Sequence, residues 1–348
     1  MSKVSIKTIA EDLNLSRNTV SKALNNSGAV AVETRQRVIQ RAAEMGYGKL
    51  EPLLKDQFAG NSEKNRKSII LFAHRDVSSF WDEIVFGIFD KLGQENYNIL
   101  YNFISNEDEE NGVMPVNILN DEVNGIILLD VFKREYVQKM LKRKLPIVFL
   151  DEPVRKYSGQ PVGDCLLIEG FNSVYELTES LIRSGKSKIG FIGDTTYCRT
   201  IYDRYNGFLQ AMIANDIPVN KEICLVGHTP QRYYDFSEVS IRLDNIAIQP
   251  DAFVCCNDDI AVWVMNYYKK RGCSIPDDIA ICGFDNKKEY TVMEPSLTTV
   301  EIKKNDLGCR LAQEILWRIE NINMPFETVV VNTKIKFGDS FPKPPENI

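Results

Sequence analysis

The pattern of residues 1–46 constrains the fold of this chain more than any other segment, because it predicts three short helices joined by tight turns. Ser5 and Ser16 can cap the first two helices. On the second helix, apolar residues recur at three-to-four-residue spacing and face inward, namely Val20, Ala23 and Leu24. A third helix runs to Met45, and Gly46 is placed to end it in a left-handed turn. The segment therefore predicts a small all-α bundle.

The outward face of the second helix predicts contact with double-stranded DNA. Polar and basic side chains cluster at its exposed start, and such a helix, held by a small helical frame, can enter the major groove. Arg17 and Lys22 suit guanine O6 and N7, whereas Asn18 suits adenine. Phosphate contacts, which position without specifying sequence, are expected from Ser16, Ser21, Asn25 and Thr34. The alternative is a helical domain whose polar face is only solvated.

Charge is distributed unevenly along the chain. The first 68 residues carry a net charge of +5 and the whole chain carries −6, so the remainder carries −11. A basic bundle on an acidic body directs the phosphate backbone of DNA to one end of the molecule. Such an asymmetry also serves solubility, so it supports DNA binding without establishing it.

The motifs of the bundle resemble those of a known family. Residues 4–25 (VSIKTIAEDLNLSRNTVSKALN) and 34–47 (TRQRVIQRAAEMGY) look like the headpiece of the LacI/GalR family of bacterial repressors. The resemblance implies a helix-turn-helix headpiece over residues 1–47 and a hinge or linker over residues 48–67. In the family, this linker folds into a short helix on operator DNA and inserts an apolar side chain into the minor groove.

The linker matches the family pattern only in part. Phe58 is the residue expected to enter the minor groove. The usual "PN..A..L" pattern is missing, Glu51 and Asp56 bring negative charge toward phosphate, and Pro52 fits only the first turn of a helix. The hinge can start at Pro52 or work differently, and a flexible tether without DNA contact is the alternative.

From residue 68 onward, short apolar runs alternate with helical stretches. The expected strands are 68–73, 97–102, 125–129, 145–150, 188–192, 222–226, 252–256 and 279–282. This alternation implies parallel sheets covered on both faces, with ligands bound beyond the carboxyl ends of the strands. It agrees with the α/β, two-lobed, periplasmic-binding-protein-like body of the family. The expected N-terminal lobe spans about 68–164 and 297–322, and the C-terminal lobe about 165–296 and 323–342.

Motifs in the body predict polar residues that bind a small molecule between the lobes. CNDDIA and GFDN resemble the family's "ND..A" and "GFDD", which places Asn257, Asp258 and Asp285 at strand ends, where their oxygens can accept hydrogen bonds. Arg204 lies in a segment similar to "R..GF" and would be a fork-shaped donor to the ligand. The alternative for the strand-end residues is ordinary turn formation and helix capping.

One more motif is expected to face the same ligand. Residues 76–81 (DVSSFW) resemble a shortened "D.SNPFF", which makes Asp76 a ligand contact and Phe80 and Trp81 an apolar wall for a sugar ring. Without the motif, both aromatic side chains would be assigned to the core.

The sequence gives no support for a catalytic site, a metal site or a cofactor. No C-x-x-C pair exists among the eight cysteines, and neither histidine has a metal-ligand partner at helical spacing. Residues 185–187 (GKS) end like a phosphate-binding loop but lie between a helix and a strand in the reverse order, so they predict a helix stop. Asp130, Asp151 and Asp258 could converge on the cleft, yet nothing requires catalysis.

These observations predict a DNA-binding transcriptional regulator, a repressor by resemblance, that is not an enzyme. Two headpieces of a homodimer would read half-sites of a near-palindromic operator roughly 34 Å apart. The family favours a sugar or sugar phosphate as effector and leaves open whether it releases or promotes DNA binding. Without a long apolar run or signal-peptide core, the chain is expected in the cytoplasm and not in a membrane. The alternative is a small-molecule-binding enzyme or sensor whose N-terminal helices mediate protein contacts.

Overall fold

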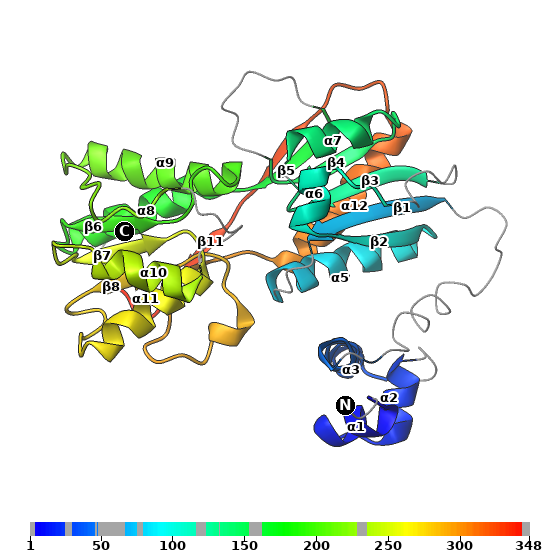
Figure 1. Cartoon of the computed structure of the whole chain (residues 1–348), viewed down its shortest axis with the longest axis horizontal. Coiled ribbons are helices and arrows are strands. Elements are labelled where there is room, and N and C mark those ends of the chain that lie inside the picture. The colour runs from blue at the N-terminus through cyan, green and yellow to red at the C-terminus, as the bar shows by residue number, and fades with distance from the viewer. Residues whose placement is uncertain are drawn as a thin grey trace. The chain divides into compact units, whose positions relative to one another are not determined.

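The structure is a computed structural model that describes residues 4–24, 30–45, 47, 67–74, 79–115, 123–131, 133–152, 162–227 and 235–342. The chain divides into two compact units, Met1–Arg66 and Lys67–Ile348. The first contains the headpiece, and the second is the body (Figure 1). Four predicted positions lie outside the described residues, namely Asn25, Gly46, Phe58 and Asp76, as does nearly all of the predicted hinge.

The headpiece consists of α1 (Ile6–Asp12), α2 (Arg17–Leu24) and α3 (Val32–Glu44), as the sequence pattern predicted. Ser5 Oγ accepts a hydrogen bond from Thr8 N at 3.3 Å and caps α1. Ser16 Oγ accepts one from Thr19 N at 3.0 Å at the start of α2. The apolar faces of the helices meet in a core of Ile9, Ala10, Val20, Ala23, Leu24, Val38, Ala42 and Tyr47.

A forked ion pair fixes the third helix to the first. Arg41 Nε and NH2 donate to the two carboxylate oxygens of Asp12 at 2.6 and 2.8 Å. The hydrogen bonds from Arg41 lower the pKa of Asp12 below its usual value. The fork therefore braces the frame that holds α2.

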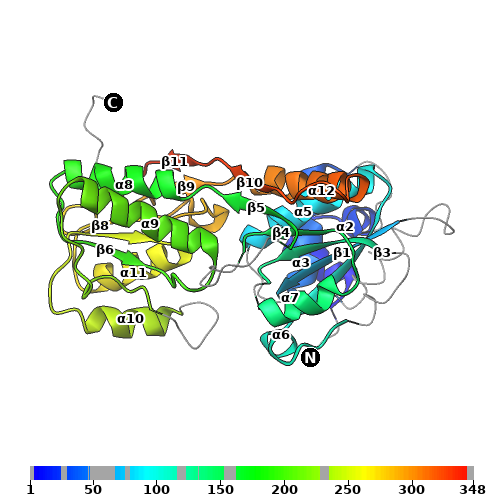
Figure 2. The ribbon, with the colours of Figure 1, turned by 90° about the horizontal axis from the view of Figure 1, so that it is seen from above.

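The first lobe of the body contains a parallel six-stranded sheet in the order β10-β5-β4-β3-β1-β2. Its strands are β1 (Ser68–His74), β2 (Asn98–Ile104), β3 (Val123–Leu129), β4 (Ile147–Leu150), β5 (Asp164–Ile168) and β10 (Thr328–Val331). Helices α5 (Ser79–Gln94) and α12 (Lys304–Glu320) cover one face, and α6 (Asn106–Asn111) and α7 (Arg134–Leu141) the other (Figures 1 and 2). Both faces are covered, which explains why β1 is buried along its whole length and β4 contains only apolar residues.

The second lobe is built on the parallel strands β6 (Ile189–Ile192), β7 (Ala252–Cys255) and β8 (Ala280–Cys282). Beside them lies an antiparallel pair, β9 (Thr299–Glu301) and β11 (Lys334–Lys336). Helices α8 (Phe171–Arg183) and α9 (Arg199–Ala214) cover one face of the sheet, and α10 (Phe236–Asp244) and α11 (Asp258–Lys270) the other (Figure 2). A short 3-10 helix, η2 (Lys288–Tyr290), follows β8.

The strand pairing differs from the predicted lobe boundaries. The chain passes between the lobes at residues 169–170, 302–303 and 332–333. Consequently β5 and β10 pair in the first lobe, where the sequence analysis assigned them to the second, and β9 pairs in the second lobe. The predicted strand 222–226 is reduced to one bridge between Leu225 and Ile192. None of β5, β9 and β10 was among the expected strands, so the sequence pattern could not assign them to a sheet.

Two further features are the state of the thiols and the GKS segment, which was expected to end a helix. All eight cysteines are free, and six are buried, as expected for thiols that pack as small hydrophobes. Gly185 has φ +90° after α8, and Lys186 N donates to Leu181 O at 3.1 Å, so the segment is the predicted helix stop. Within the described ranges, no helix combines the length and the apolar character needed to span a bilayer.

Candidate functional site

The outward face of α2 carries the side chains predicted to read DNA. Arg17, Asn18 and Lys22 are exposed, whereas the opposite face of the helix is buried in the headpiece core. Of the predicted phosphate contacts, Ser16 is exposed, and Ser21 and Thr34 are half-buried. The helix thus separates a polar, basic face from an apolar one, as a groove-binding helix requires.

The body holds a cavity of about 260 Å³ between its two lobes. Pockets for small molecules usually measure roughly 300–1,000 Å³, so this one suits a small ligand. Its aromatic walls are Phe80 and Trp81 on α5, Tyr197 before α9 and Trp263 on α11. Its charged lining consists of Asp130, Asp151, Arg204, Asp259, Asp285 and Lys287.

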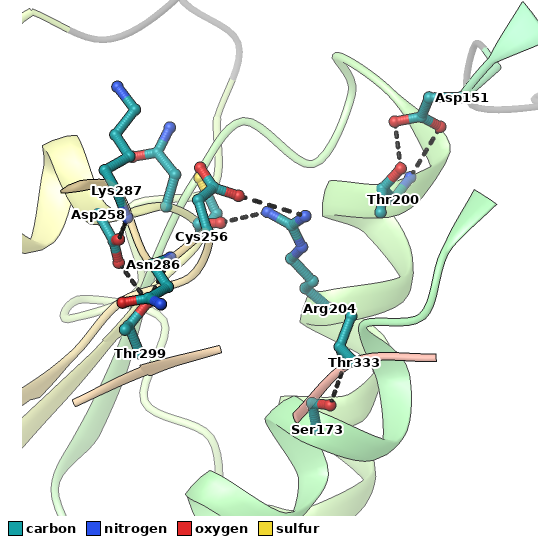
Figure 3. Close-up of polar contacts among 12 residues, drawn as sticks. Asp151, Ser173, Thr200, Arg204, Cys256, Asp258, Asn286, Lys287, Thr299 and Thr333 are labelled. Carbon is teal, nitrogen blue, oxygen red and sulfur yellow. Dashed lines mark hydrogen bonds and ion pairs between the residues drawn. The ribbon is translucent and has the colours of Figure 1, made fainter. Parts of the chain in front are cut away.

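Five of the predicted effector residues line this cavity, namely Phe80, Trp81, Arg204, Asn257 and Asp285. Asp258 does not. Its carboxylate accepts hydrogen bonds from Thr299 Oγ1 at 2.6 Å and from Lys287 N at 2.8 Å (Figure 3), beside a separate cavity of about 70 Å³. Successive residues at the start of α11 point in different directions, which is why Asp258 faces β9 while its neighbours face the larger cavity.

Arg204 extends from α9 toward the loop after β7 and is 6% exposed (Figure 3). Its NH1 donates to Cys256 O at 2.5 Å, and its NH2 lies 4.0 Å from Asp285 Oδ1. The guanidinium also stacks 3.5 Å from the ring centre of Phe284. Among the described residues, its buried Nε has no hydrogen-bond partner.

Asp285 and Asp258 form a buried carboxyl pair in the second lobe. Burial, together with the charge of Asp285, raises the pKa of Asp258 to about 7. Burial also raises the pKa of Asp285 to about 6, against the lowering effect of Arg204, Lys287 and Lys304. Asp285 has φ +114°, a strained backbone at a cavity-lining residue.

The start of α9 is capped by the first lobe. Asp151, at the end of β4, accepts hydrogen bonds from Thr200 N at 3.2 Å and from Thr200 Oγ1 (Figure 3). The next residue, Glu152, pairs with Arg199 at 2.6 Å. A carboxylate at a helix N-terminus is stabilised by the helix dipole, although burial raises the pKa of Asp151 overall. In the same way, Tyr197 OH donates to Asp130 across the cavity.

Several lining residues were not predicted from the sequence. Asp259 and Lys287 adjoin the motifs CNDDIA and GFDN, and they form an ion pair at 2.7 Å. Trp263 lies one helical turn after Asp259 on α11, so helix periodicity carried a usable signal for it. Tyr197 belongs to no motif. Its place at the cavity depends on how the loop before α9 meets the other lobe, which the sequence pattern does not show.

Known proteins resemble the chain over nearly its whole length. Residues 5–49 match the family described as bacterial regulatory proteins, lacI family, and residues 178–341 match the periplasmic binding protein-like domain. The chain belongs to the lacI family. This LacI-family protein is a DNA-binding transcriptional repressor with an effector-binding domain, and members of its family are not enzymes.

Individual relatives are distant but nearly full-length. The probable HTH-type transcriptional repressor ExuR of Bacillus subtilis is 26% identical over 97% of this chain and 98% of its own. The ribose operon repressor of Haemophilus influenzae is 25% identical over 94% and 95%. In structure, the transcriptional regulator CelR in complex with cellobiose covers 97% of this chain and 99% of its own, with a TM-score of 0.69 and 19% identity.

A second solved structure supports the fold of the body. The LacI-family regulator of Enterococcus faecium with bound ribose covers 79% of this chain and 98% of its own, with a TM-score of 0.65 and 20% identity. Both structural comparisons show similarity of fold only.

Proposed function

We propose that this repressor binds a near-palindromic operator as a homodimer and that a small polar molecule in the 260 Å³ cavity changes its operator affinity. The observation that carries the proposal is the exposed trio Arg17, Asn18 and Lys22 opposite the buried face of α2. Two such helices would enter successive major grooves roughly 34 Å apart. The protein would act in the cytoplasm, where its operator lies.

The headpiece side chains expected to contact DNA divide into two proposed roles. Arg17 and Lys22 would donate to guanine O6 and N7, and Asn18 would pair with adenine. Ser16, Ser21, Asn25 and Thr34 would contact phosphates and fix the register of the helix. Phe58 remains the proposed minor-groove wedge.

The charges of the cavity favour an uncharged sugar over a sugar phosphate as effector. Among the residues that the structure describes, four aspartates and two cations line the cavity, and both of these cations already have partners. Lys287 is paired with Asp259, and Arg204 is bonded to Cys256 O near Asp285. A phosphate would meet net negative charge away from water, which is unfavourable. Hydroxyl groups instead complement carboxylate acceptors such as Asp285, and Trp81 and Trp263 suit the apolar face of a ring.

DNA recognition is tested by comparing specific with random duplexes. The operator is obtained by selecting duplexes from a random library with the intact protein. We expect log affinity to fall linearly with log salt, and Arg17→Ala to cost roughly 1–3 kcal/mol on the selected duplex and less on random DNA. Lys7→Ala removes the same charge from an exposed site on α1 and serves as the matched control. Equal losses on both duplexes for Arg17→Ala would remove this residue from base recognition.

The effector class is tested by thermal shift with pairs of sugars and their phosphates. A ligand that binds only the native cavity increases the free energy of unfolding by about 2.7 kcal/mol when its concentration is 100 times its Kd. The melting temperature rises as a result. We expect the uncharged sugars to raise the melting temperature of the parent protein. This shift should be lost in Arg204→Ala and kept in Arg183→Ala, because Arg183 is a surface residue paired with Glu179. A larger shift from the phosphorylated partner would contradict the charge argument.

A further inference from the structure

Lys304 is a buried cation at the junction of the two lobes. It is the first residue of α12 in the first lobe and is 4% exposed. Its Nζ donates to Asn286 O in the second lobe at 3.0 Å. The same Nζ lies 6.0 Å from the ring centre of Phe80, a wall of the effector cavity. Its neighbour Lys303 is exposed. An ammonium group in this position carries positive charge from one lobe into the other.

Lys304 bonds to the residue that follows Asp285, and its charge lowers the pKa values of the carboxyl pair, Asp258 and Asp285. Among the described residues, the other titratable and charged groups that interact with the pair are Arg204, Cys255, Cys256, Asp259, Cys282, Lys287 and Tyr290. Two of these are cations held by second-lobe partners: Lys287 bonds to both carboxylate oxygens of Asp259, at 2.9 and 2.7 Å, and Arg204 bonds to Cys256 O. Of the described first-lobe residues, Lys304 is the cation that lowers the pKa values of both carboxyl groups.

We propose that Lys304 is a positioning residue that keeps Asp285 ionised across the lobe junction, so that Asp285 can accept hydrogen bonds from the effector. A displacement of α12 from Asn286 would withdraw this charge and favour a proton on the pair. Proton and effector then compete for Asp285, which makes the effector response depend on pH near neutrality. The statement that Asp285 binds the effector, the effector half of this inference, rests on the proposed function. The statement that the charge of Lys304 keeps Asp285 ionised, the electrostatic half, does not.

The electrostatic half predicts a pH-dependent loss of stability when Lys304 is neutralised. A buried carboxyl with a raised pKa binds more protons in the folded chain than in the unfolded chain, where its pKa is about 4. The free energy of unfolding therefore falls as pH rises from that value to the folded pKa. Removing the charge of Lys304 raises the pKa of the carboxyl pair in the folded chain further. The free energy of unfolding then continues to fall to a higher pH. The penalty of Lys304→Met must then be larger at pH 8 than at pH 5.

The experiment is urea unfolding of the full chain between pH 5 and pH 8. Tryptophan fluorescence reports on the body, because all three tryptophans, Trp81, Trp263 and Trp317, lie in it. We expect the ratio of unfolding constants between Lys304→Met and the parent to increase roughly tenfold across this range for each unit of pKa shift. Lys303→Met, which neutralises the exposed neighbouring lysine, should show no such increase, and Lys304→Arg should restore the parent profile.

Two further variants keep the test decisive if Lys304→Met does not fold. Lys304→Gln retains a donor for Asn286 O but lacks the charge, so it should show the same pH-dependent penalty. Adding Asp285→Asn should reduce that penalty, because one of the titrating groups is gone. A penalty independent of pH in Lys304→Gln or Lys304→Met would overturn the inference. Neither result depends on DNA or effector, so failure here is distinct from failure of the proposed function.

Discussion

Arg318 and Asp164 form an ion pair in which each side chain is only 1% exposed. Arg318 Nε and NH2 donate to the carboxylate at 2.5 and 2.6 Å, and its remaining N–H groups donate to carbonyls that include Met324 O and Pro325 O, at 2.7 and 2.8 Å. Asp164 Oδ1 also accepts from Glu327 N at 2.7 Å. The pair thus joins α12, β5 and the approach to β10. The desolvation of each charge is offset only while its partner is present.

Replacing Arg318 with methionine should destabilise the body by about 3–5 kcal/mol, because it leaves Asp164 charged, buried and without its cation. Urea unfolding of the full chain measures the effect. Arg183→Met is the matched control, since Arg183 pairs with Glu179 on the surface of α8 and its side chain is 46% exposed. A surface pair contributes about 0–1 kcal/mol. Equal losses in the two variants would show that Asp164 relaxes toward water.

Single positions of the site could be predicted only where a motif fixed both the residue and its direction. Arg204 and Asp285 were predicted and line the cavity. Asp258 was placed at the correct strand end, but its side chain turns toward Thr299. That turn depends on β9, which is distant in sequence. Lys304 carries no sequence signal, because its importance arises from Asn286 and Phe80 in other segments.

At the scale of elements, the close approach of α5 and α12 depends on two glycines. A Cβ on Gly87 would lie 2.1 Å from Asn305 O, and one on Gly308 would lie 1.9 Å from Ile84 O. Backbone atoms cannot move away as a side-chain tip can, so each methyl group would separate the helices. The absence of side chains therefore sets the distance between the two helices that cover one face of the sheet.

Gly87→Ala should lower the stability of the body by about 1–3 kcal/mol through overpacking, although alanine is the better helix former. Gly93→Ala tests this on the same helix, because a Cβ there would have no atom within 4 Å. We expect it to raise stability by about 0.5–1 kcal/mol. Unfolding midpoints of both variants in urea provide the comparison, and the expected signs are opposite. Stabilisation by both substitutions would mean that α5 and α12 can separate at little cost.

Elements with a clear periodicity could be predicted from sequence, and pairing between distant segments could not. The helical stretches expected between the apolar runs are present, for example as α5 and α7. By contrast, β10 and β11 contain four and three residues and were not predicted. Such strands are too short to show alternation, and pairing with β5 and β9 is what defines them.

For the whole molecule, two units of opposite charge have separate tasks, and regulation requires that they be coupled. The net charge of +5 up to residue 68 against −11 for the remainder keeps phosphate attraction on the headpiece side of the sequence. The cavity lies within the body, and α2, the helix proposed to contact DNA, lies within the headpiece. A ligand in one can affect the other only if it binds the DNA-competent and DNA-free forms with different affinity.

This requirement makes the coupling measurable from either end. If the effector changes operator affinity by some factor, operator DNA must change effector affinity by the same factor, typically 5–150-fold. Trp81 and Trp263 line the cavity, so tryptophan fluorescence can follow effector binding with and without the selected operator. Random DNA at the same salt is the control, because it engages the headpiece charge without the base contacts. Effector affinity that is identical with operator, with random DNA and without DNA would exclude regulation through this cavity. A change with operator alone would establish both the coupling and, by its sign, whether the effector releases or promotes DNA binding.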